Sequence, residues 1–377
     1  MNILKTSLPL FFAALPIFAN AQEATVKFQK QVIAYESTES VGVFDVDNDG
    51  TLDLVSGSFW YKGPGFLDRS LIGQIKRFGE YYEDFSTIPM DVNEDGKMDF
   101  VTGGWFEGTL VWKENPGDGS EWKTHEIAKT GNIETSRGFD IDGDGVLEIV
   151  PNTPRKALAY YKKTGPNEFE KFPVAEMHGH GLGFGDINGD GRGDFVIAEG
   201  WLEAPSDLKT GKWIHHADFD LGDASIPMIV ADVNGDELAD IIVGQAHGFG
   251  LFWLEQKKEG GKISFAKHEI DPYQSQYHTM EWVDLDNDGQ NELVTGKRYR
   301  AHNGKDLGGK DYAGLYYFKW NGESFTKNVI SYGPIGEGKG SGLYFSIADL
   351  DGDGWKDIVV AGKDGLVVFK NLGRPEN

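Results

Sequence analysis

The sequence contains no cysteine, which excludes disulfide bonds, cysteine-ligated metal sites and a cysteine lipid anchor. Long apolar runs are also scarce. Beyond the N-terminus, no stretch approaches the roughly 20 residues that a membrane-spanning helix needs, so we expect no membrane span. Basic residues are outnumbered, with 36 Lys and Arg against 60 Asp and Glu and a formal net charge of -24. No basic patch or motif indicates a nucleic-acid partner.

The N-terminal segment has the features of an export signal. Lys5 precedes an apolar run from Leu8 to Phe18, and the small-residue pattern Ala19-Asn20-Ala21 follows. This order predicts a cleavable signal peptide at residues 1–21 and a mature protein that begins near Gln22. We therefore expect one domain over residues 22–377 in a periplasmic or secreted protein, and the sequence leaves the oligomeric state open.

Glycine, at 51 residues, and an Asp-rich pattern are what the chain has in abundance. The pattern recurs seven times: "DVDNDGTLD" at Asp45, "DVNEDGKMD" at Asp91, "DIDGDGVLE" at Asp140, "DINGDGRGD" at Asp186, "DVNGDELAD" at Asp232, "DLDNDGQNE" at Asp284 and "DLDGDGWKD" at Asp349. The starts are 46, 49, 46, 46, 52 and 65 residues apart. Such a period is typical of propeller blades.

Short apolar segments surround each motif and predict four strands per repeat. The last repeat has only three, because the chain stops after "LVVFKNLG", whereas "TVKFQKQVIAYE" near the N-terminus resembles the fourth strands of other repeats. We therefore predict an all-β fold, a seven-bladed β-propeller of four-stranded antiparallel blades. The N-terminal strand would close the ring and leave no open sheet edge.

The repeated loop has oxygen-bearing side chains at positions one, three and five, Gly at six and an acid at nine, which favours calcium. A simpler interpretation is an ion-free turn in which Asp and Asn side chains contact their own backbone. "DVNGDELAD" is the weakest candidate, because Glu237 replaces the Gly. The predicted calcium ligands are Asp45, Asp47, Asp49, Asp53, Asp91, Asn93, Asp95, Asp99, Asp140, Asp142, Asp144, Glu148, Asp186, Asn188, Asp190, Asp194, Asp284, Asp286, Asp288, Glu292, Asp349, Asp351, Asp353 and Asp357.

Four histidines are expected on the face opposite the Asp-rich loops. His180 and His278 each fall six residues before a motif, and His247 and His302 follow the second strands of the fifth and sixth repeats. Lys297 and Arg298 lie in the same region, in "GKRYRAHNG". The same counting places further candidates for substrate binding on this rim: Arg137, Glu199, Trp201, Gln245 and Asn303. By contrast, His125, His215, His216 and His268 fall on outer strands and are interpreted as structural or solvent-facing.

The Asp-rich motifs resemble FG-GAP or VCBS-type repeats over essentially the whole mature chain. More narrowly, "HGLGFGDINGDGRGDFVIAEGWLEAP", "GQAHGFGLFWLEQ" and "QYHTMEWVDLDNDGQNELVTGKRYRAHNG" resemble the propeller domain of aldos-2-ulose dehydratases, and ulvan lyases of the propeller type are a more distant likeness. The dehydratase resemblance implies elimination of water from a keto-sugar. The fungal dehydratase uses additional cupin domains for a later isomerisation; we expect no such domain after the propeller, so the resemblance implies elimination alone.

Elimination beside a carbonyl needs a base, stabilisation of an enolate oxygen and an acid for the leaving oxygen. We expect His180, His247 and His278 to hold a divalent ion, with zinc the expected metal, that polarises the carbonyl. His302 or Tyr277 would transfer the proton, and Lys297 and Arg298 would stabilise negative charge. Two alternatives stay open. One is a metal-free uronate lyase in which Arg298 neutralises the carboxylate. The other is a calcium-stabilised, non-enzymatic glycan-binding or adhesion propeller.

Overall fold

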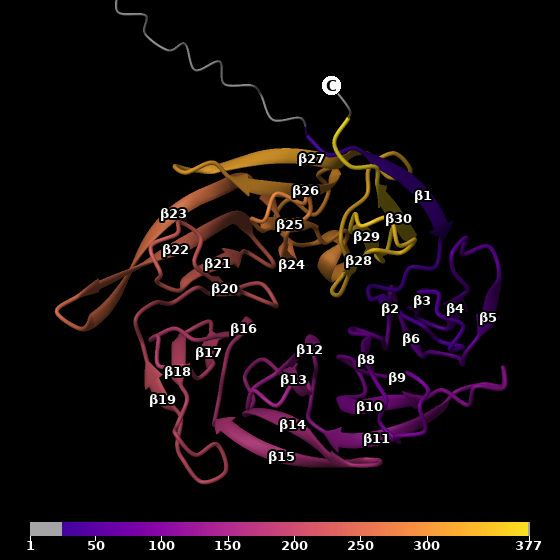
Figure 1. The fold of residues 1–377 in the computed structure, drawn as a ribbon, viewed down its shortest axis with the longest axis horizontal. Coiled ribbons are helices and arrows are strands. Elements are labelled where there is room, and N and C mark those ends of the chain that lie inside the picture. Colours follow the sequence, from indigo (N-terminus) through magenta and orange to yellow (C-terminus); the bar gives the residue numbers. More distant parts are fainter. Residues whose placement is uncertain (1–24, 376–377) are drawn as a thin grey trace, which may run out of the picture.

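Seven four-stranded antiparallel sheets are arranged around a centre in the computed structural model, which describes residues 25–375 (Figure 1). The first strands of neighbouring blades contact one another and so form the innermost layer. This confirms the predicted seven-bladed β-propeller. The predicted signal peptide, residues 1–21, lies outside the described residues.

The blades follow the chain in order. Blade 1 comprises β2 (Gly42–Phe44), β3 (Asp53–Ser56), β4 (Phe59–Tyr61) and β5 (Arg69–Leu71). Blade 2 comprises β8 (Ile88–Met90), β9 (Asp99–Gly103), β10 (Thr109–Glu114) and β11 (Lys123–Lys129). Blade 3 comprises β12 (Thr135–Phe139), β13 (Glu148–Asn152), β14 (Leu158–Gly165) and β15 (Glu168–Ala175). Blade 4 comprises β16 (Leu182–Gly185), β17 (Asp194–Ile197), β18 (Gly200–Glu203) and β19 (Ile214–His216).

The second half of the ring repeats this plan. Blade 5 comprises β20 (Ile229–Ala231), β21 (Asp240–Gly244), β22 (Phe249–Glu259) and β23 (Lys262–Ser275). Blade 6 comprises β24 (Tyr277–Val283), β25 (Glu292–Lys297), β26 (Ala313–Trp320) and β27 (Phe325–Gly333). Blade 7 comprises β28 (Ser346–Ala348), β29 (Asp357–Val360), β30 (Leu366–Asn371) and β1 (Phe28–Ala34). Two small elements lie outside the blades, a hairpin of β6 (Arg77–Phe78) with β7 (Tyr81–Tyr82) and the short 3₁₀ helix η1 (Ala301–Gly304).

The N-terminal strand closes the ring as predicted. Strand β1 pairs antiparallel with β30, with Phe28 opposite Asn371 and Val32 opposite Val367. Blade 7 therefore combines both ends of the described chain, which lie side by side in Figure 1. Closure gives the outer edge of β30 a partner for its backbone groups and ties the termini together.

Each Asp-rich loop joins the first strand of a blade to the second, and its own side chains fold it. In all seven loops the first Asp accepts a hydrogen bond from the N–H of the sixth residue. The acid at position nine is buried and accepts the N–H of the second residue. In blade 5, Glu237 takes the left-handed backbone conformation (φ 67°) at the position where the other loops have Gly. The hydrogen-bonded turn therefore forms even in the loop with the weakest motif.

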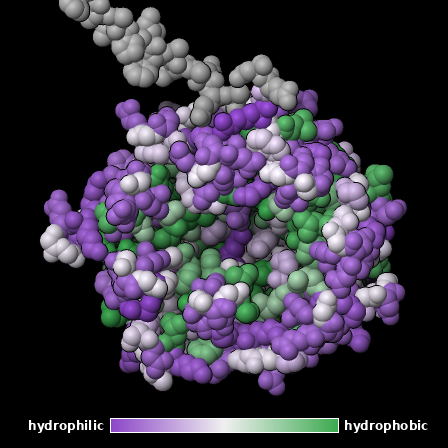
Figure 2. All heavy atoms as spheres, viewed as in Figure 1, coloured by the Kyte–Doolittle hydropathy of each residue, from purple (hydrophilic) through white to green (hydrophobic). Residues whose placement is uncertain are grey.

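The core is divided among the seven junctions between blades. Each apolar cluster of buried side chains draws on two neighbours. Ile358 and Phe369 of blade 7, for example, pack with Val294 and Leu315 of blade 6. Figure 2 shows hydrophilic residues over the outer rim and apolar residues around a central hollow. Within residues 25–375, no helix is long and apolar enough to cross a membrane.

Candidate metal centre

Residues at one position of the repeat lie at the centre of the face opposite the Asp-rich loops. This position lies six residues before the first Asp of each motif, just before or near the start of the innermost strand. Four of the seven blades carry an ionisable side chain there and three carry an apolar one. In order, the residues are Glu39, Phe85, Glu134, His180, Ile226, His278 and Leu343. The propeller symmetry directs this one position of each blade toward a common centre.

Three histidines and one glutamate converge at this centre. His180 Nε2 lies 3.2 Å from His247 Nε2, and His278 Nε2 lies 3.1 Å from Glu134 Oε1. The distance from His180 Nε2 to Glu134 Oε1 is 3.8 Å. One ligand atom from each of the four residues falls within 4.8 Å of the others. The three histidines predicted as metal ligands are thus brought together, and the fourth potential ligand is a glutamate that the prediction missed.

In two of these rings, a hydrogen bond at the second nitrogen, Nδ1, fixes the tautomer. His180 Nδ1 lies 2.8 Å from the carbonyl oxygen of Ala224, and His247 Nδ1 lies 2.9 Å from Asp306 Oδ2. Both partners only accept hydrogen bonds, so each Nδ1 carries a hydrogen and, in the neutral rings, each Nε2 carries a lone pair. Two such lone pairs face each other across 3.2 Å. A cation between them removes this repulsion.

Burial disfavours a positive charge on two of the three rings. Burial lowers the pKa of His247 to about 4, and burial together with the charge of Arg298 lowers that of His278 well below its usual value. Three imidazoles and a carboxylate form a ligand set that suits zinc in four-coordinate sites. The hydrogen bonds at Nδ1 are the outer contacts that orient metal-binding histidines in proteins. The residues present therefore fit a divalent metal ion.

An arginine holds the glutamate in place. Arg298 Nη1 donates to Glu134 Oε1 at 2.9 Å, and its Nε donates to Glu39 Oε1 at 2.9 Å. Arg298 is 2% exposed. Although burial favours the protonated acid, the adjacent imidazoles and this guanidinium hold the pKa of Glu134 well below its usual range. The predicted role of Arg298 toward substrate is not what the structure shows, because two buried carboxylates already occupy its guanidinium.

His302 stands beside the cluster on η1. Its ring stacks on His247 with centroids 4.5 Å apart, and its Nδ1 lies 2.8 Å from Asp306 Oδ1. Asp306 thus contacts both rings, one with each oxygen. The His302 side chain is 57% exposed, and His302 and Asn303 both have left-handed backbone conformations, with φ of 47° and 59°. Such strained positions cluster at functional sites.

A cavity of about 450 Å³ opens on this cluster. Glu199, predicted to bind substrate, lines it, and its Oε2 accepts a hydrogen bond from the Gly179 N–H at 3.1 Å. The other lining residues are Trp105, Glu134, Pro154, Arg155, Met177, His178, Gly179, His180, Gly222, Asp223, His247 and His302. Exposed Arg155 also lines the cavity and brings a positive charge to it. The sequence pattern did not predict this residue.

Two predicted catalytic residues point elsewhere. Tyr277 is fully buried and its hydroxyl donates to Asp271 Oδ2 at 2.6 Å, while burial raises the pKa of Tyr277 far above its usual value. Lys297 is also fully buried. Its ammonium donates to Ser275 Oγ, Gln276 Oε1 and the Gly308 carbonyl at 2.6, 2.6 and 2.7 Å, and burial lowers the pKa of Lys297 to about 8. Tyr277 thus joins blade 6 to β23 of blade 5, Lys297 holds the long loop at Gly308, and neither side chain lines the cavity.

Four predicted substrate-binding residues are also used elsewhere. Arg137 is 5% exposed, donates to the Ile226 carbonyl at 2.8 Å and lies over the Tyr344 ring, so it joins blades at the centre of the ring. Trp201 is buried in a junction between blades and donates to Asp218 Oδ2 at 2.9 Å. In each case, another group of the fold already engages the polar atoms of the side chain.

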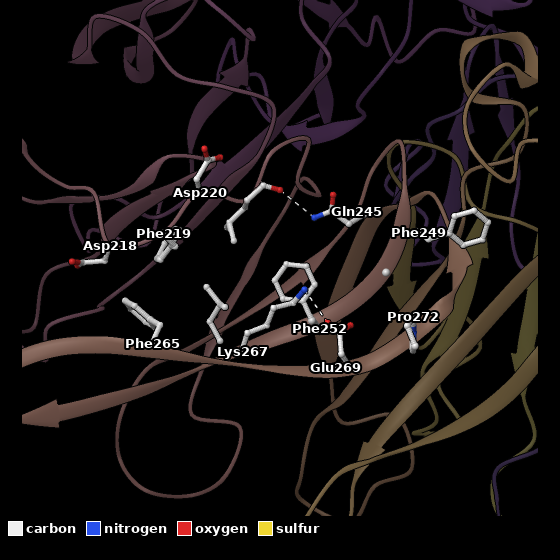
Figure 3. A pocket seen from close by; sticks show the side chains of 13 residues that line it. Asp218, Phe219, Asp220, Gln245, Phe249, Phe252, Phe265, Lys267, Glu269 and Pro272 are labelled. Carbon is white, nitrogen blue, oxygen red and sulfur yellow. Dashed lines mark hydrogen bonds and ion pairs between the residues drawn. The ribbon is translucent and has the colours of Figure 1, made fainter.

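Gln245 and Asn303 line other depressions. Gln245 donates to the Leu221 carbonyl at 3.1 Å in a groove of about 560 Å³ between β22, β23 and the segment before β20 (Figure 3). None of the four clustered residues lines this groove. Asn303 lines a separate depression with Tyr299 and Arg300. Counting along the repeat predicted that both residues lie beside the histidines. They line other depressions instead.

The acids of the Asp-rich loops approach one another in some blades. One oxygen each from Asp45, Asp47 and Asp53 lies within 4.8 Å of the others, and the corresponding acids of blades 3 and 6 do the same. Calcium in these loops stays a prediction.

Comparison with known proteins agrees with the repeat. Residues 59–150 and 210–295 match the family described as FG-GAP-like repeat. These two stretches are therefore similar to FG-GAP-like repeats. No curated protein matches it by sequence. Among solved structures, the exotype rhamnogalacturonan lyase YesX aligns with 13% identity and a TM-score of 0.51, covering 93% of this chain and 74% of YesX.

Two further rhamnogalacturonan lyases align more weakly. YesW gives 14% identity, a TM-score of 0.48 and coverage of 93% and 73%, and the PL11 enzyme of Bacillus licheniformis gives 13%, 0.49, 92% and 74%. At this identity the YesX alignment supports the propeller fold and carries no residue roles. No aldos-2-ulose dehydratase is among these matches.

Proposed function

We propose that this protein is an exported carbohydrate lyase or dehydratase that performs β-elimination at a divalent metal centre of His180, His247, His278 and Glu134. The observation that carries the proposal is the convergence of three histidines and one glutamate, of which Glu134, His180 and His247 line a cavity. A divalent ion held there by these four residues would polarise a substrate carbonyl as a Lewis acid if it took the carbonyl oxygen as a fifth ligand.

His302 is the best-placed base. Asp306 accepts from Nδ1 and leaves Nε2 as the nitrogen that can take a proton. In the elimination, Nε2 of His302 takes the proton from the carbon beside the carbonyl. The electron pair of the broken C–H bond then forms the carbon–carbon double bond, and the bond from the adjacent carbon to the leaving oxygen breaks. That oxygen needs a proton, which the protonated His302 or water can return. His302 replaces Tyr277 in this role because the Tyr277 hydroxyl is bonded to Asp271.

A metal-free lyase acting on a uronate polysaccharide is the second candidate. Arg298, which that hypothesis used to neutralise the substrate carboxylate, is bonded to Glu39 and Glu134. In the metal-free mechanism, exposed Arg155, which lines the cavity, neutralises the substrate carboxylate in place of Arg298. YesX is a rhamnogalacturonan lyase, which makes rhamnogalacturonan one substrate to test.

Elemental analysis by mass spectrometry tests the metal centre directly. We expect about one zinc or similar ion per chain in the wild type and its loss in His180→Ala/His278→Ala. The matched control is His125→Ala/His268→Ala, two histidines that pair with Glu114 and Glu255 on outer strands. Equal metal content in both variants would contradict the proposal.

Activity separates the remaining possibilities. A keto-sugar, a polyuronate and rhamnogalacturonan are offered to wild type and His302→Ala, and unsaturated products are followed by ultraviolet absorbance. We expect at least a 100-fold loss in His302→Ala, the effect typical of removing a general base. Product formation without bound transition metal would favour the metal-free lyase. Binding of a glycan without any product would favour the non-enzymatic propeller.

A further inference from the structure

The third strands divide the seven blades into two classes. At the position opposite the ninth-position acid, four blades have lysine and three have glutamate. In blade 1, for example, Tyr61 pairs with Leu54, which places the next residue, Lys62, opposite Asp53. The lysines are Lys62, Lys162, Lys319 and Lys370 in blades 1, 3, 6 and 7, and the glutamates are Glu114, Glu203 and Glu255 in blades 2, 4 and 5.

The third position of the Asp-rich loop changes together with this residue. Every lysine blade has aspartate there and every glutamate blade has asparagine. The aspartates are Asp47, Asp142, Asp286 and Asp351, and the asparagines are Asn93, Asn188 and Asn234. A blade that gains a negative charge in the loop thus gains a positive one on the third strand. This compensation within one chain indicates that the two positions interact.

The lysine ammonium lies among the loop carboxylates. Lys162 Nζ pairs with Asp142, lies 2.6 Å from Asp144 and 3.3 Å from Glu148. In blade 6, Lys319 Nζ lies 2.6 Å from Asp286 and 3.8 Å from Glu292.

The two remaining lysine blades repeat the arrangement. Lys62 pairs with Asp47 and with Asp49 at 2.9 Å, and Lys370 pairs with Asp351. An ammonium has three donors, so it can serve two or three of these carboxylates at once.

The glutamates of the other class face a different partner. Glu114, Glu203 and Glu255 lie 2.7, 2.8 and 2.9 Å from the Nε2 atoms of fourth-strand histidines His125, His216 and His268. Each histidine stacks on a third-strand tryptophan. In blade 5, Asn234 also donates to Glu255 Oε1 at 3.1 Å.

The asparagine can make this last contact where an aspartate would meet the glutamate with like charge. Three of the four outer histidines interpreted from the sequence as structural thus belong to this second class, whereas His215 contacts the Glu199 carbonyl instead.

We propose that in blades 1, 3, 6 and 7 the third-strand lysine is the built-in cation of the Asp-rich loop and takes the place of calcium. A carboxylate cluster of this density needs a positive charge at its centre, and in these blades the chain supplies it. These four loops hold sixteen of the predicted calcium ligands, and in each loop the lysine pairs with at least one of them. This inference does not depend on the proposed enzymatic function.

Removing the lysine should convert such a loop into a calcium site. The variant is Lys162→Met in blade 3, and the control is Lys171→Met on β15 of the same blade, an exposed lysine with the same change of charge. Calcium binding is measured on chelator-treated protein by native mass spectrometry and isothermal titration. We expect one additional calcium per chain in Lys162→Met only. We also expect calcium to raise the melting temperature of this variant by a few degrees more than that of the control. Equal stoichiometry in the two variants would overturn the proposal.

Two further measurements keep the proposal falsifiable if Lys162→Met does not fold. The wild type should bind no more than three calcium ions, one for each glutamate blade at most, and four or more would overturn the assignment. In blade 5, Asn234→Asp and Glu255→Lys should each lower the melting temperature, and the double variant should lose less than the sum of the two. Simple additivity would show that the paired positions do not interact.

Discussion

The two faces of the propeller use the same repeat in opposite ways. On one face, seven loops carry nearly the same Asp-rich sequence and fold through the same two side-chain hydrogen bonds. On the other face, one register position holds glutamate, histidine or an apolar residue, depending on the blade. Repetition gives the first face its shape, whereas differences between repeats give the second face its chemistry.

Charge is also treated differently at the two faces. Most carboxylates of the Asp-rich loops are at least partly exposed, and only the ninth-position acids are consistently buried. On the opposite face, Glu39, Glu134 and Arg298 are all buried and depend on one another. Ion pairs should therefore contribute little at the first face and strongly at the second. Four substitutions test this comparison, from the largest expected effect to the smallest.

Arg298→Met should have the largest effect on stability. It leaves Glu39 and Glu134 buried without their cation, and breaking a buried pair in this way costs about 3–5 kcal/mol. The free energy of unfolding is measured in urea, without metal and with added zinc. Zinc should restore part of the loss, because a divalent ion beside Glu134 supplies positive charge. A loss below about 1 kcal/mol would mean that the buried cluster is no more sensitive than the surface.

Asp240→Ala should come second. Asp240 is fully buried and accepts N–H groups of Val233 and Gln256 at 3.0 and 2.8 Å. Leaving buried donors unsatisfied costs about 1–3 kcal/mol. Asp236→Ala in the same loop is the control, because Asp236 is exposed, and it should cost less than half as much in urea unfolding. Equal losses would show that the ninth-position acid is not what holds the loop.

Asp84→Asn should change the pH dependence of stability. Asp84 is buried, accepts hydrogen bonds from Thr102 Oγ1 and the Gly57 N–H, and burial raises its pKa from 3.8 to about 6. Between about pH 4 and 6 the Asp84 carboxyl is therefore protonated in the folded protein and ionised in the unfolded chain, so its contribution to stability falls as pH rises through this window.

The variant lacks this contribution. The difference in unfolding free energy between wild type and Asp84→Asn should shift by about 2–3 kcal/mol from pH 4 to pH 7, in the direction that favours the variant at higher pH. Urea unfolding of both proteins at several pH values measures it. A constant difference would mean that Asp84 titrates normally.

Arg300→Met should have the smallest effect. Arg300 pairs with Glu80 at the rim, and its side chain is 40% exposed. Exposed pairs contribute less than about 1 kcal/mol. As the neighbour of Arg298 in the sequence, with the same charge change, Arg300→Met is also the matched control for the first prediction. Two similar losses in thermal unfolding would remove the distinction between buried and exposed pairs.

Much of the candidate site could be predicted from the repeat, and one potential ligand was missed for a reason that the repeat explains. Counting six residues back from each motif found His180 and His278, and the same count gives Glu134 and Glu39. A search restricted to histidines overlooked the acids. His302 and Glu199 also lie at the cavity, where the count placed them.

The residues that counting misplaced have long polar side chains. Tyr277, Lys297 and Trp201 are near the correct end of their blades, yet their polar atoms bond to Asp271, Ser275 and Asp218. Register along a strand fixes where a Cα lies. It does not fix which of several nearby groups the end of a long side chain will contact.

The sequence by itself determined the seven-bladed ring, its closure by the N-terminal strand and the face on which the histidines gather. These follow from local rules, because periodic strands, self-bonded turns and the pairing of sheet edges depend on nearby residues and the period. Only the tertiary structure decided which side chains meet. Arg298 bonds Glu39 from 259 positions away, and Glu134 from 164. Contacts across blades depend on side-chain direction and burial, which a one-dimensional pattern does not contain.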